Sequence, residues 1–324
     1  MLPLSFLFLI VITLRNKFYD WGIIKTVDLN IPVISVGNIT AGGAGKTPFT
    51  IYLAEYLLNK NFKVGIISRG YKKNSNEGIY IIEGNDTTPS IEKLGDEPYL
   101  IYRRLKGISE NFILASGENK SSLAKIVSEK YKPDVIIIDD GFQHRKLKRN
   151  LDIVLTEGEE SVFDKFLLPA GNLRELKSSL KRADLVIKNN KAMLIEANDS
   201  VSIKYISKGY FDVFETIMQP DNAVYTLCGI ANPYSFYSLI NRDKLNILRK
   251  FEFADHYSFN EEDLEKLFTG IDKDKVIVTT EKDFVKLKSM NNLLKKYKIV
   301  YLKIEVQFKK GKDIFENKMK EIIS

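Results

Sequence analysis

The residues best suited to chemistry form a glycine-rich run that ends in Gly45, Lys46 and Thr47. An apolar, β-rich stretch (residues 31–37) precedes this run, and a stretch with helical spacing (residues 47–58) follows it. The run matches the last three positions of the phosphate-loop motif G-x-x-x-x-G-K-[ST], with Thr40 in place of the first glycine. Backbone N–H groups of such a loop bind phosphate oxygens at a helix N-terminus. The predicted nucleotide-binding residues are Thr40, Ala41, Gly42, Gly43, Ala44, Gly45, Lys46 and Thr47. An ordinary glycine-rich turn is the alternative.

A phosphate loop also predicts a magnesium site. Lys46 would bridge the β- and γ-phosphates of ATP, and the Thr47 hydroxyl would ligate Mg²⁺. Asp139 is the last residue of the apolar stretch DVIIID at residues 134–139, and Asp140 follows it directly. Because the carboxyl ends of parallel strands meet at one edge of a sheet, this acidic pair should lie beside the loop. Either aspartate could approach the metal.

The loop is compatible with several classes of nucleotide-binding protein. The N-K-x-D motif by which switch GTPases read guanine is absent from the sequence. Partitioning-type ATPases carry a signature lysine at the second loop position, where this chain has Ala41. These two observations leave a kinase or an unassigned ATPase.

Short apolar strands alternate with helical stretches around the motifs. Such strands are typical of a parallel sheet that is covered on both faces. The expected strands lie at residues 31–37, 63–68, 112–115, 134–139, 151–155 and 184–188, and the expected helices include 47–58 and 121–130. The fold class predicted is therefore α/β: a phosphate-loop, NTPase-like, mostly parallel sheet with helices on both faces.

The helical pattern is lost between about residues 189 and 221, and a second α/β series then begins. This break predicts a hairpin-like linker before a smaller C-terminal α/β domain. The predicted divisions are an N-terminal helix at 1–22, a phosphate-loop domain at 23–190, a linker at 191–221 and the smaller domain at 222–324.

Composition limits the possible partners and compartments. The chain has 324 residues, enough for two domains, and a formal net charge of +7. This charge suits an anionic partner but is too small to indicate nucleic acid, and no nucleic-acid-binding motif accompanies it. A single cysteine, Cys228, cannot form an internal disulfide, which favours a reducing, cytosolic setting.

The N-terminal stretch at residues 2–14 is uncharged, and Arg15, Lys17 and Trp21 follow it. Thirteen helical residues reach only about 20 Å, against roughly 30 Å for a bilayer core, which disfavours a transmembrane span. The basic residues follow the apolar stretch, whereas a secretory signal has them before it. We expect residues 2–21 to lie in one leaflet of an anionic membrane surface. A buried N-terminal core helix is the alternative.

Eight blocks, in order, resemble the tetraacyldisaccharide 4′-kinase family of lipid A biosynthesis. They are SVGNITAGGAGKTP (35–48), ISRGYKK (67–73), GDEP (95–98), DDGFQHRKLKRNLDIV (139–154), LLPAGNLRE (167–175), CGIANP (228–233), FADHYSF (253–259) and TTEKDFVKL (279–287). The resemblance implies an ATP- and Mg²⁺-dependent kinase that phosphorylates the 4′-hydroxyl of a tetraacyl glucosamine disaccharide 1-phosphate. It also implies that the enzyme acts at the cytoplasmic face of the bacterial inner membrane. A two-stranded linker between the domains is a further implication.

The resemblance also assigns roles to particular residues. Asp96 and His256 would form a catalytic dyad, in which the carboxylate accepts or orients the sugar hydroxyl proton and the histidine orients the carboxylate. Since His256 falls in the smaller domain, domain closure would complete this dyad. Arg174 and Glu175 would lie near the nucleotide phosphates and the metal, respectively, although a surface ion pair is the alternative. A competing function is a membrane-peripheral ATPase acting as a switch or assembly factor, which would not need Asp96 or His256.

Overall fold

The computed structural model describes residues 1–70, 78–87, 89–157, 166–189 and 201–323. Its contacts divide the chain into two compact units. Unit 1 comprises Met1–Lys204 and Val306–Ser324, and unit 2 comprises Tyr205–Glu305.

Unit 1 is built on a mostly parallel sheet, which confirms the expected mixed α/β class. Its strand order is β7-β6-β1-β5-β2-β4-β3, and only the edge strand β3 runs antiparallel to its neighbour. The strands are β1 (Val33–Gly37), β2 (Val64–Ser68), β3 (Ile79–Glu83), β4 (Phe112–Gly117), β5 (Val135–Asp139), β6 (Leu151–Glu157) and β7 (Leu185–Asn189).

Helices cover the sheet of unit 1. Strands β1, β2 and β5 are buried at every position, as expected where both faces are covered. Helix α5 packs through Leu123, Ala124 and Val127 against one face, and α2 packs against the same three strands. The helices of this unit are α1 (Leu2–Asp20), α2 (Lys46–Leu58), α3 (Ile91–Leu94), α4 (Asp96–Lys106), α5 (Lys120–Tyr131), the 3₁₀ helix η2 (Lys177–Arg182) and α10 (Lys312–Ile323).

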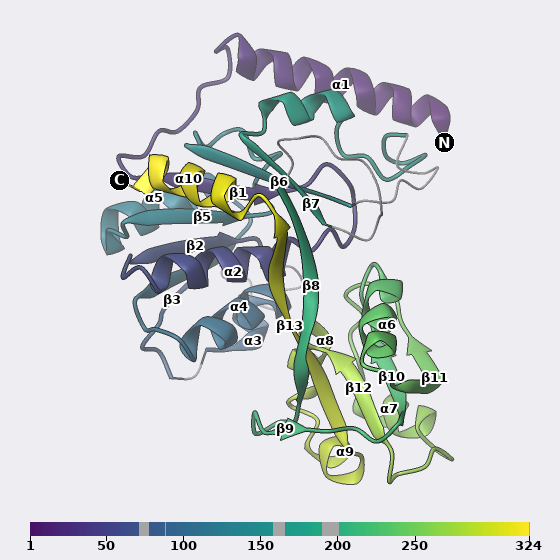
Figure 1. Ribbon diagram of the computed structural model, residues 1–324. Helices are drawn as coiled ribbons and strands as arrows, with labels where there is room; N and C mark the ends of the chain where they lie inside the picture. The colour runs from purple at the N-terminus through teal and green to yellow at the C-terminus, as the bar shows by residue number, and fades with distance from the viewer. Residues whose placement is uncertain (71–77, 88, 158–165, 190–200, 324) are drawn as a thin grey trace. The chain divides into compact units, whose positions relative to one another are not determined.

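Helix α1 runs along the outside of unit 1 (Figure 1). Ser5 is its one buried residue. Its inner face carries Ser5, Phe8, Leu9 and Asn16, and its outer face is apolar and exposed. The exposed residues include Leu2, Leu4, Phe6, Leu7, Ile10, Val11, Leu14 and Phe18. This distribution contradicts the alternative of a buried core helix.

The C-terminal residues 306–324 group with unit 1, whereas the sequence analysis placed them in the smaller domain. The reason is aromatic packing. The ring of Phe315 in α10 lies 6.1 Å from that of Phe49 and 6.0 Å from that of Tyr52, both in α2. Phe315 is fully buried, so α10 completes the core of unit 1.

Unit 2 contains parallel strands in the order β11-β10-β12-β13 (Ile299–Lys310), which belong to the same hydrogen-bonded strand order as those of unit 1. Apolar clusters form around Leu227 and around Cys228, neighbouring residues of β10 that point to opposite faces. Cys228 is a buried free thiol, and burial raises its pKa to about 11. The elements are β9 (Ile217–Met218), β10 (Ala223–Cys228), α6 (Pro233–Arg242), β11 (Asn246–Glu252), α7 (Glu261–Leu267), β12 (Val276–Thr280), α8 (Glu281–Leu287) and α9 (Asn291–Lys296).

Two long strands, β8 (Val201–Phe211) and β13 (Ile299–Lys310), each have residues in both units. They are neighbours in the strand order, and β8 also pairs antiparallel with β9. The predicted linker at 191–221 is therefore partly strand, and its residues 191–200 lie outside the described ranges.

Candidate nucleotide-binding site

The phosphate loop lies between the end of β1 and the start of α2, as the sequence predicts. Gly42 and Gly45 have positive φ values of 117° and 80°, a left-handed backbone that favours glycine. Gly45 precedes the first helical residue, Lys46, so the N-terminus of α2 faces the loop. Thr47 follows as the second residue of α2.

The Lys46 ammonium points across the loop toward the end of β5. Its Nζ donates to Asn38 Oδ1 at 3.1 Å and lies 3.6 Å from Asp140 Oδ1. Asn38 in turn donates to the Thr40 hydroxyl at 3.1 Å. The structure therefore brings together the lysine and one of the two predicted carboxylates, as a site for phosphate and a cation requires.

The paired carboxylates at the end of β5 have different surroundings. Asp139 is buried and accepts hydrogen bonds from the hydroxyls of Thr50 and Ser68, each at 3.1 Å. Burial, together with the charge of Glu97, raises the pKa of Asp139 to about 6. Burial acts in the same direction on Asp140, but Lys46 and other nearby cations outweigh it and lower its pKa to about 2. Asp140 therefore stays ionised well below neutral pH, whereas Asp139 takes up a proton as the pH falls through about 6.

The raised pKa of Asp139 predicts a pH-dependent effect of Asp139→Asn on stability. A carboxyl whose pKa rises on folding to about 6 does not lower the free energy of unfolding below about pH 4. It lowers that free energy by the full amount above about pH 6. Without nucleotide or metal, we expect Asp139→Asn to raise the free energy of unfolding at pH 8 by up to about 3 kcal/mol. The gain should shrink as the pH falls through 6 toward 4.

Denaturant titrations at pH 4, 6 and 8 measure this effect. Asp28→Asn is the control because Asp28 is a surface residue, with 63% of its side chain exposed. An equal gain for Asp139→Asn at all three pH values would contradict the assignment.

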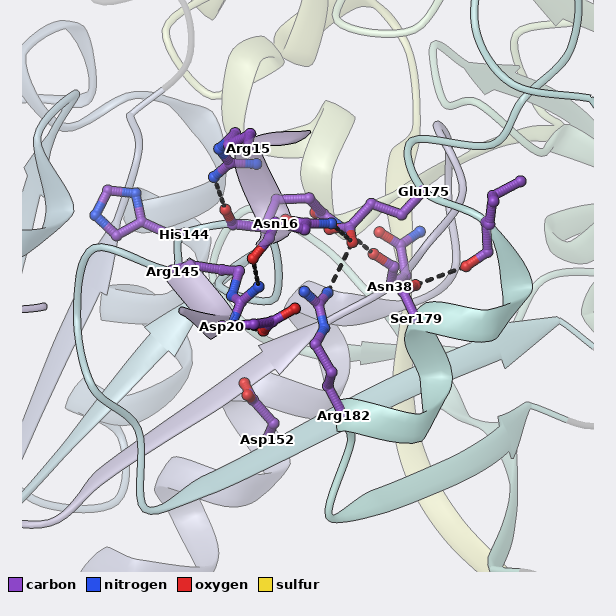
Figure 2. Close-up of polar contacts among 12 residues, drawn as sticks. Arg15, Asn16, Asp20, Asn38, His144, Arg145, Asp152, Glu175, Ser179 and Arg182 are labelled. Carbon is purple, nitrogen blue, oxygen red and sulfur yellow. Dashed lines mark hydrogen bonds and ion pairs between the residues drawn. The ribbon is translucent and has the colours of Figure 1, made fainter. Parts of the chain in front are cut away.

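Arg174 and Glu175 follow the turn that lies beside the loop. Arg174 Nη1 donates to both carboxylate oxygens of Asp140, at 3.0 and 2.9 Å. Glu175 is 1% exposed, and its Oε2 accepts from Asn16 at 2.9 Å and from Arg182 at 2.7 Å (Figure 2). Arg174 therefore lies beside Asp140, and its contact with the nucleotide phosphates stays a prediction. The arrangement of Glu175 favours a structural role over the metal-ligand role that the sequence predicted.

Lys120, the first residue of α5, belongs to the site but was missed by the sequence analysis. Its Nζ donates to the backbone carbonyls of Asp139 and Asp140, each at 2.7 Å. Burial lowers the pKa of Lys120. Asp140 has a left-handed backbone with φ of 49°, which this ammonium helps to hold. The sequence signal that could have indicated Lys120 is its position at the start of a helix just after β4, at the same sheet edge.

Asp96 is the first residue of α4, and it is 8% exposed. Its Oδ1 accepts from the backbone N–H of Glu97 at 2.9 Å, so the helix N-terminus stabilises the carboxylate. Glu97 is close enough to Asp139 for its charge to help raise the pKa of Asp139. The start of α4 thus lies toward the same edge of the unit 1 sheet.

His256 lies in unit 2, in the loop that follows β11. Its backbone is left-handed, with φ of 58°. Lys282 Nζ lies 3.0 Å from Nε2 of His256 and 3.2 Å from Oδ1 of Asp255. An ammonium can only donate, so Nε2 of His256 is the acceptor in this contact. Lys282, to which the sequence analysis assigned no role, therefore orients His256.

A phosphate loop between a parallel strand and a helix, with an ionised strand-end carboxylate beside its lysine, defines a phosphate-loop nucleotide-binding α/β protein. The whole chain, residues 1–324, matches the family described as tetraacyldisaccharide-1-P 4′-kinase. The chain belongs to this family, the kinases of lipid A biosynthesis. Its membership confirms the predicted phosphotransferase over the ATPase switch.

Individual relatives agree over nearly the whole chain. The tetraacyldisaccharide 4′-kinase of Flavobacterium psychrophilum is 34% identical over 342 residues, covering 98% of this chain and 94% of the relative. That of Aquifex aeolicus is 33% identical over 320 residues, covering 96% of each. The crystal structure of LpxK from Aquifex aeolicus in complex with ATP matches with a TM-score of 0.78 at 29% identity, covering 100% of this chain and 98% of that one.

Proposed function

We propose that this kinase transfers the γ-phosphoryl group of Mg·ATP to the 4′-hydroxyl of a tetraacyldisaccharide 1-phosphate. The observation that carries the proposal is Lys46 aimed at the ionised Asp140 across the phosphate loop. In this proposal the backbone N–H groups of the loop and Lys46 bind the phosphates, and Arg174 adds a further cation. The relative solved with ATP supports the choice of nucleotide.

Asp140 and the Thr47 hydroxyl fit a magnesium ion. Among the described residues no group of three or more His, Cys, Asp or Glu side chains could hold a metal alone, and Mg²⁺ at nucleotide sites takes few protein ligands besides phosphate and water. The bound ion would neutralise charge on the β- and γ-phosphates. Asp139 is the poorer ligand because it is buried, hydrogen-bonded to two hydroxyls and has a raised pKa.

Labelled phosphate transfer tests this proposal directly. Full-length protein in detergent, given γ-labelled ATP, Mg²⁺ and a tetraacyldisaccharide 1-phosphate, should produce labelled lipid. Chelation of the metal should stop the transfer, and added Mg²⁺ should restore it. If the protein binds ATP but labels no lipid while an active relative does so in the same assay, the proposed acceptor is wrong. If transfer continues after chelation, the proposed need for Mg²⁺ is wrong.

Asp96 and His256 are the proposed proton-handling residues. The Asp96 carboxylate, stabilised at the start of α4, accepts or orients the proton of the 4′-hydroxyl. The His256 ring, oriented by Lys282, contributes from unit 2. Support for both comes from the GDEP and FADHYSF blocks together with these local contacts.

Helix α1 is proposed to bind the cytoplasmic face of the bacterial inner membrane. The outer face of α1 is apolar and exposed, whereas a helix that faces water carries polar residues on that side. By length and composition α1 could also cross a membrane. However, the backbone carbonyl of Asn16 and the Asp20 carboxylate accept hydrogen bonds from Arg145, which holds this end against unit 1. We therefore propose that α1 lies in one leaflet, with Lys17 and Trp21 at the headgroups.

Polar substitutions on the outer face of α1 should release the protein from membranes. We expect the triple variant Leu7→Gln, Val11→Gln, Leu14→Gln to bind vesicles at least ~10-fold more weakly, since each buried aliphatic side chain contributes roughly 1.5–3 kcal/mol. Flotation with vesicles containing anionic lipid measures this. A triple glutamine variant at Lys125, Lys130 and Lys132, on or just after α5, is the control. Equal flotation of both variants would contradict the proposal.

A further inference from the structure

Residues 167–175, the bridging segment, lie between helix α1 and the phosphate loop. On the side of α1, Ser5 makes two hydrogen bonds with the segment. Its hydroxyl donates to the Leu167 carbonyl at 2.9 Å and accepts from the Ala170 N–H at 2.9 Å. At the other end of the segment, the Asn16 amide donates to Glu175 at 2.9 Å (Figure 2). Helix α1 therefore holds the segment at both ends.

On its other side the bridging segment pairs with the start of the phosphate loop. Ala41 N–H donates to the Asn172 carbonyl at 2.6 Å, and Arg174 N–H donates to the Ile39 carbonyl at 2.7 Å. Between these bonds, Thr40 and Leu173 form an antiparallel bridge. The backbone that leads into the loop is thus positioned by the segment rather than by β1 alone.

Apolar packing joins the same three parts. Ile39, just before the loop, and Leu167 and Leu173, in the bridging segment, are buried in one cluster. Phe8 and Leu9 of α1 pack against this cluster. A shift of α1 relative to the rest of unit 1 would therefore move the segment and the loop backbone with it, because close-packed groups transmit displacement.

The polar contacts of α1 are buried, which makes them sensitive to substitution. Ser5 is 7% exposed and Glu175 is 1% exposed. Arg182 is the second donor to Glu175, at 2.7 Å. Loss of the Asn16 amide would leave the buried carboxylate with a single donor among the described residues, and under-satisfied buried charges are costly.

We infer that Ser5 and Asn16 are positioning residues for ATP, which hold the phosphate loop in its binding geometry through the bridging segment. The inference rests on the proposed binding of ATP at this loop. It gives the inner face of α1 a role separate from the membrane contact of its outer face. Substitutions on the inner face should therefore change the affinity for ATP, and substitutions on the outer face should change the binding to membranes.

ATP affinity of the full-length protein in detergent micelles, with Mg²⁺ present, tests the inference. We expect Ser5→Ala and Asn16→Ala each to raise the Kd for ATP by about 5- to 10-fold. The double variant should fall short of the product of the two effects, because both residues act on one segment. The KM for the lipid acceptor should change less than about 2-fold. Ser179→Ala is the matched control, since it removes an exposed hydroxyl that bonds only the Leu176 carbonyl among the described residues.

Two further variants separate positioning from folding. Ser5→Thr keeps the hydroxyl and should keep the ATP affinity. Asn16→Asp keeps the side-chain shape but sets a carboxylate against Glu175, so it should weaken ATP binding more than Asn16→Ala does. Melting temperatures measured alongside identify any variant that does not fold.

The outcomes separate the inference from the function on which it rests. Folded alanine variants that bind ATP like the wild type, even with lower melting temperatures, would overturn the inference. A wild-type protein that binds no ATP would instead overturn the proposed function.

Discussion

Lys46→Met should reduce kcat/KM for phosphoryl transfer by about 10³-fold, roughly 4 kcal/mol of transition-state stabilisation. The substitution removes the ammonium that the loop aims at the phosphates and keeps an unbranched side chain of similar length. The fold should persist, because α2 is anchored by the buried Phe49, Leu53 and Leu57. Initial rates of lipid phosphorylation with ATP measure the effect.

The control for this prediction is Lys60→Met. Lys60 lies just beyond the other end of α2, exposed to solvent, with its Nζ 5.0 Å from the centre of the Tyr56 ring. The same chemical change there should leave kcat/KM within about 2-fold. If Lys46→Met transfers phosphate at a comparable rate, the glycine-rich run is an ordinary turn and the nucleotide binds elsewhere.

Asp96→Asn should lower kcat by about 10²- to 10⁴-fold and leave ATP affinity nearly unchanged. The amide keeps the shape of the side chain and can still accept the hydrogen bond from Glu97 N–H, but it cannot accept a proton from the sugar hydroxyl. Because Asp96 lies outside the phosphate loop, nucleotide binding should persist. Turnover and ATP titrations on the same preparation give the two constants.

Glu92→Gln is the matched control for Asp96→Asn. Glu92 is an exposed carboxylate in the neighbouring short helix α3, and its replacement should leave both constants unchanged. Wild-type turnover of the Asp96→Asn variant would show that Asp96 takes no part in the proton-handling step. A variant that has lost ATP binding as well would indicate a role in nucleotide binding instead.

Much of the nucleotide site could be predicted because its chemistry is local in the sequence. The loop at residues 40–47 lies within one strand-to-helix connection, and Asp139 and Asp140 end a buried strand. The rule that parallel strands end at one sheet edge then brings the two motifs together. Their different pKa values could not be predicted, since they depend on burial and on the charges of Glu97, Lys120 and Arg174, which approach from other elements.

Features that depend on long-range packing were harder to predict. The edge strand β11 has mostly exposed residues, so it lacks the apolar pattern of the central strands. Ser5 lies in an apolar stretch and Asn16 between two basic residues, and their partners are more than 150 residues away. The sequence analysis placed α10 with its neighbours in the chain, whereas Phe315 packs on α2.

The position of α10 has a consequence for the order in which the protein forms during synthesis. Unit 2 is a continuous stretch of chain, Tyr205–Glu305, whereas unit 1 also requires the residues that follow it. Domains generally fold as units while the ribosome is still translating. Unit 2 can therefore fold before Phe315 packs against the aromatic rings of α2. Unit 1, which carries the phosphate loop, is synthesised first but finishes folding last.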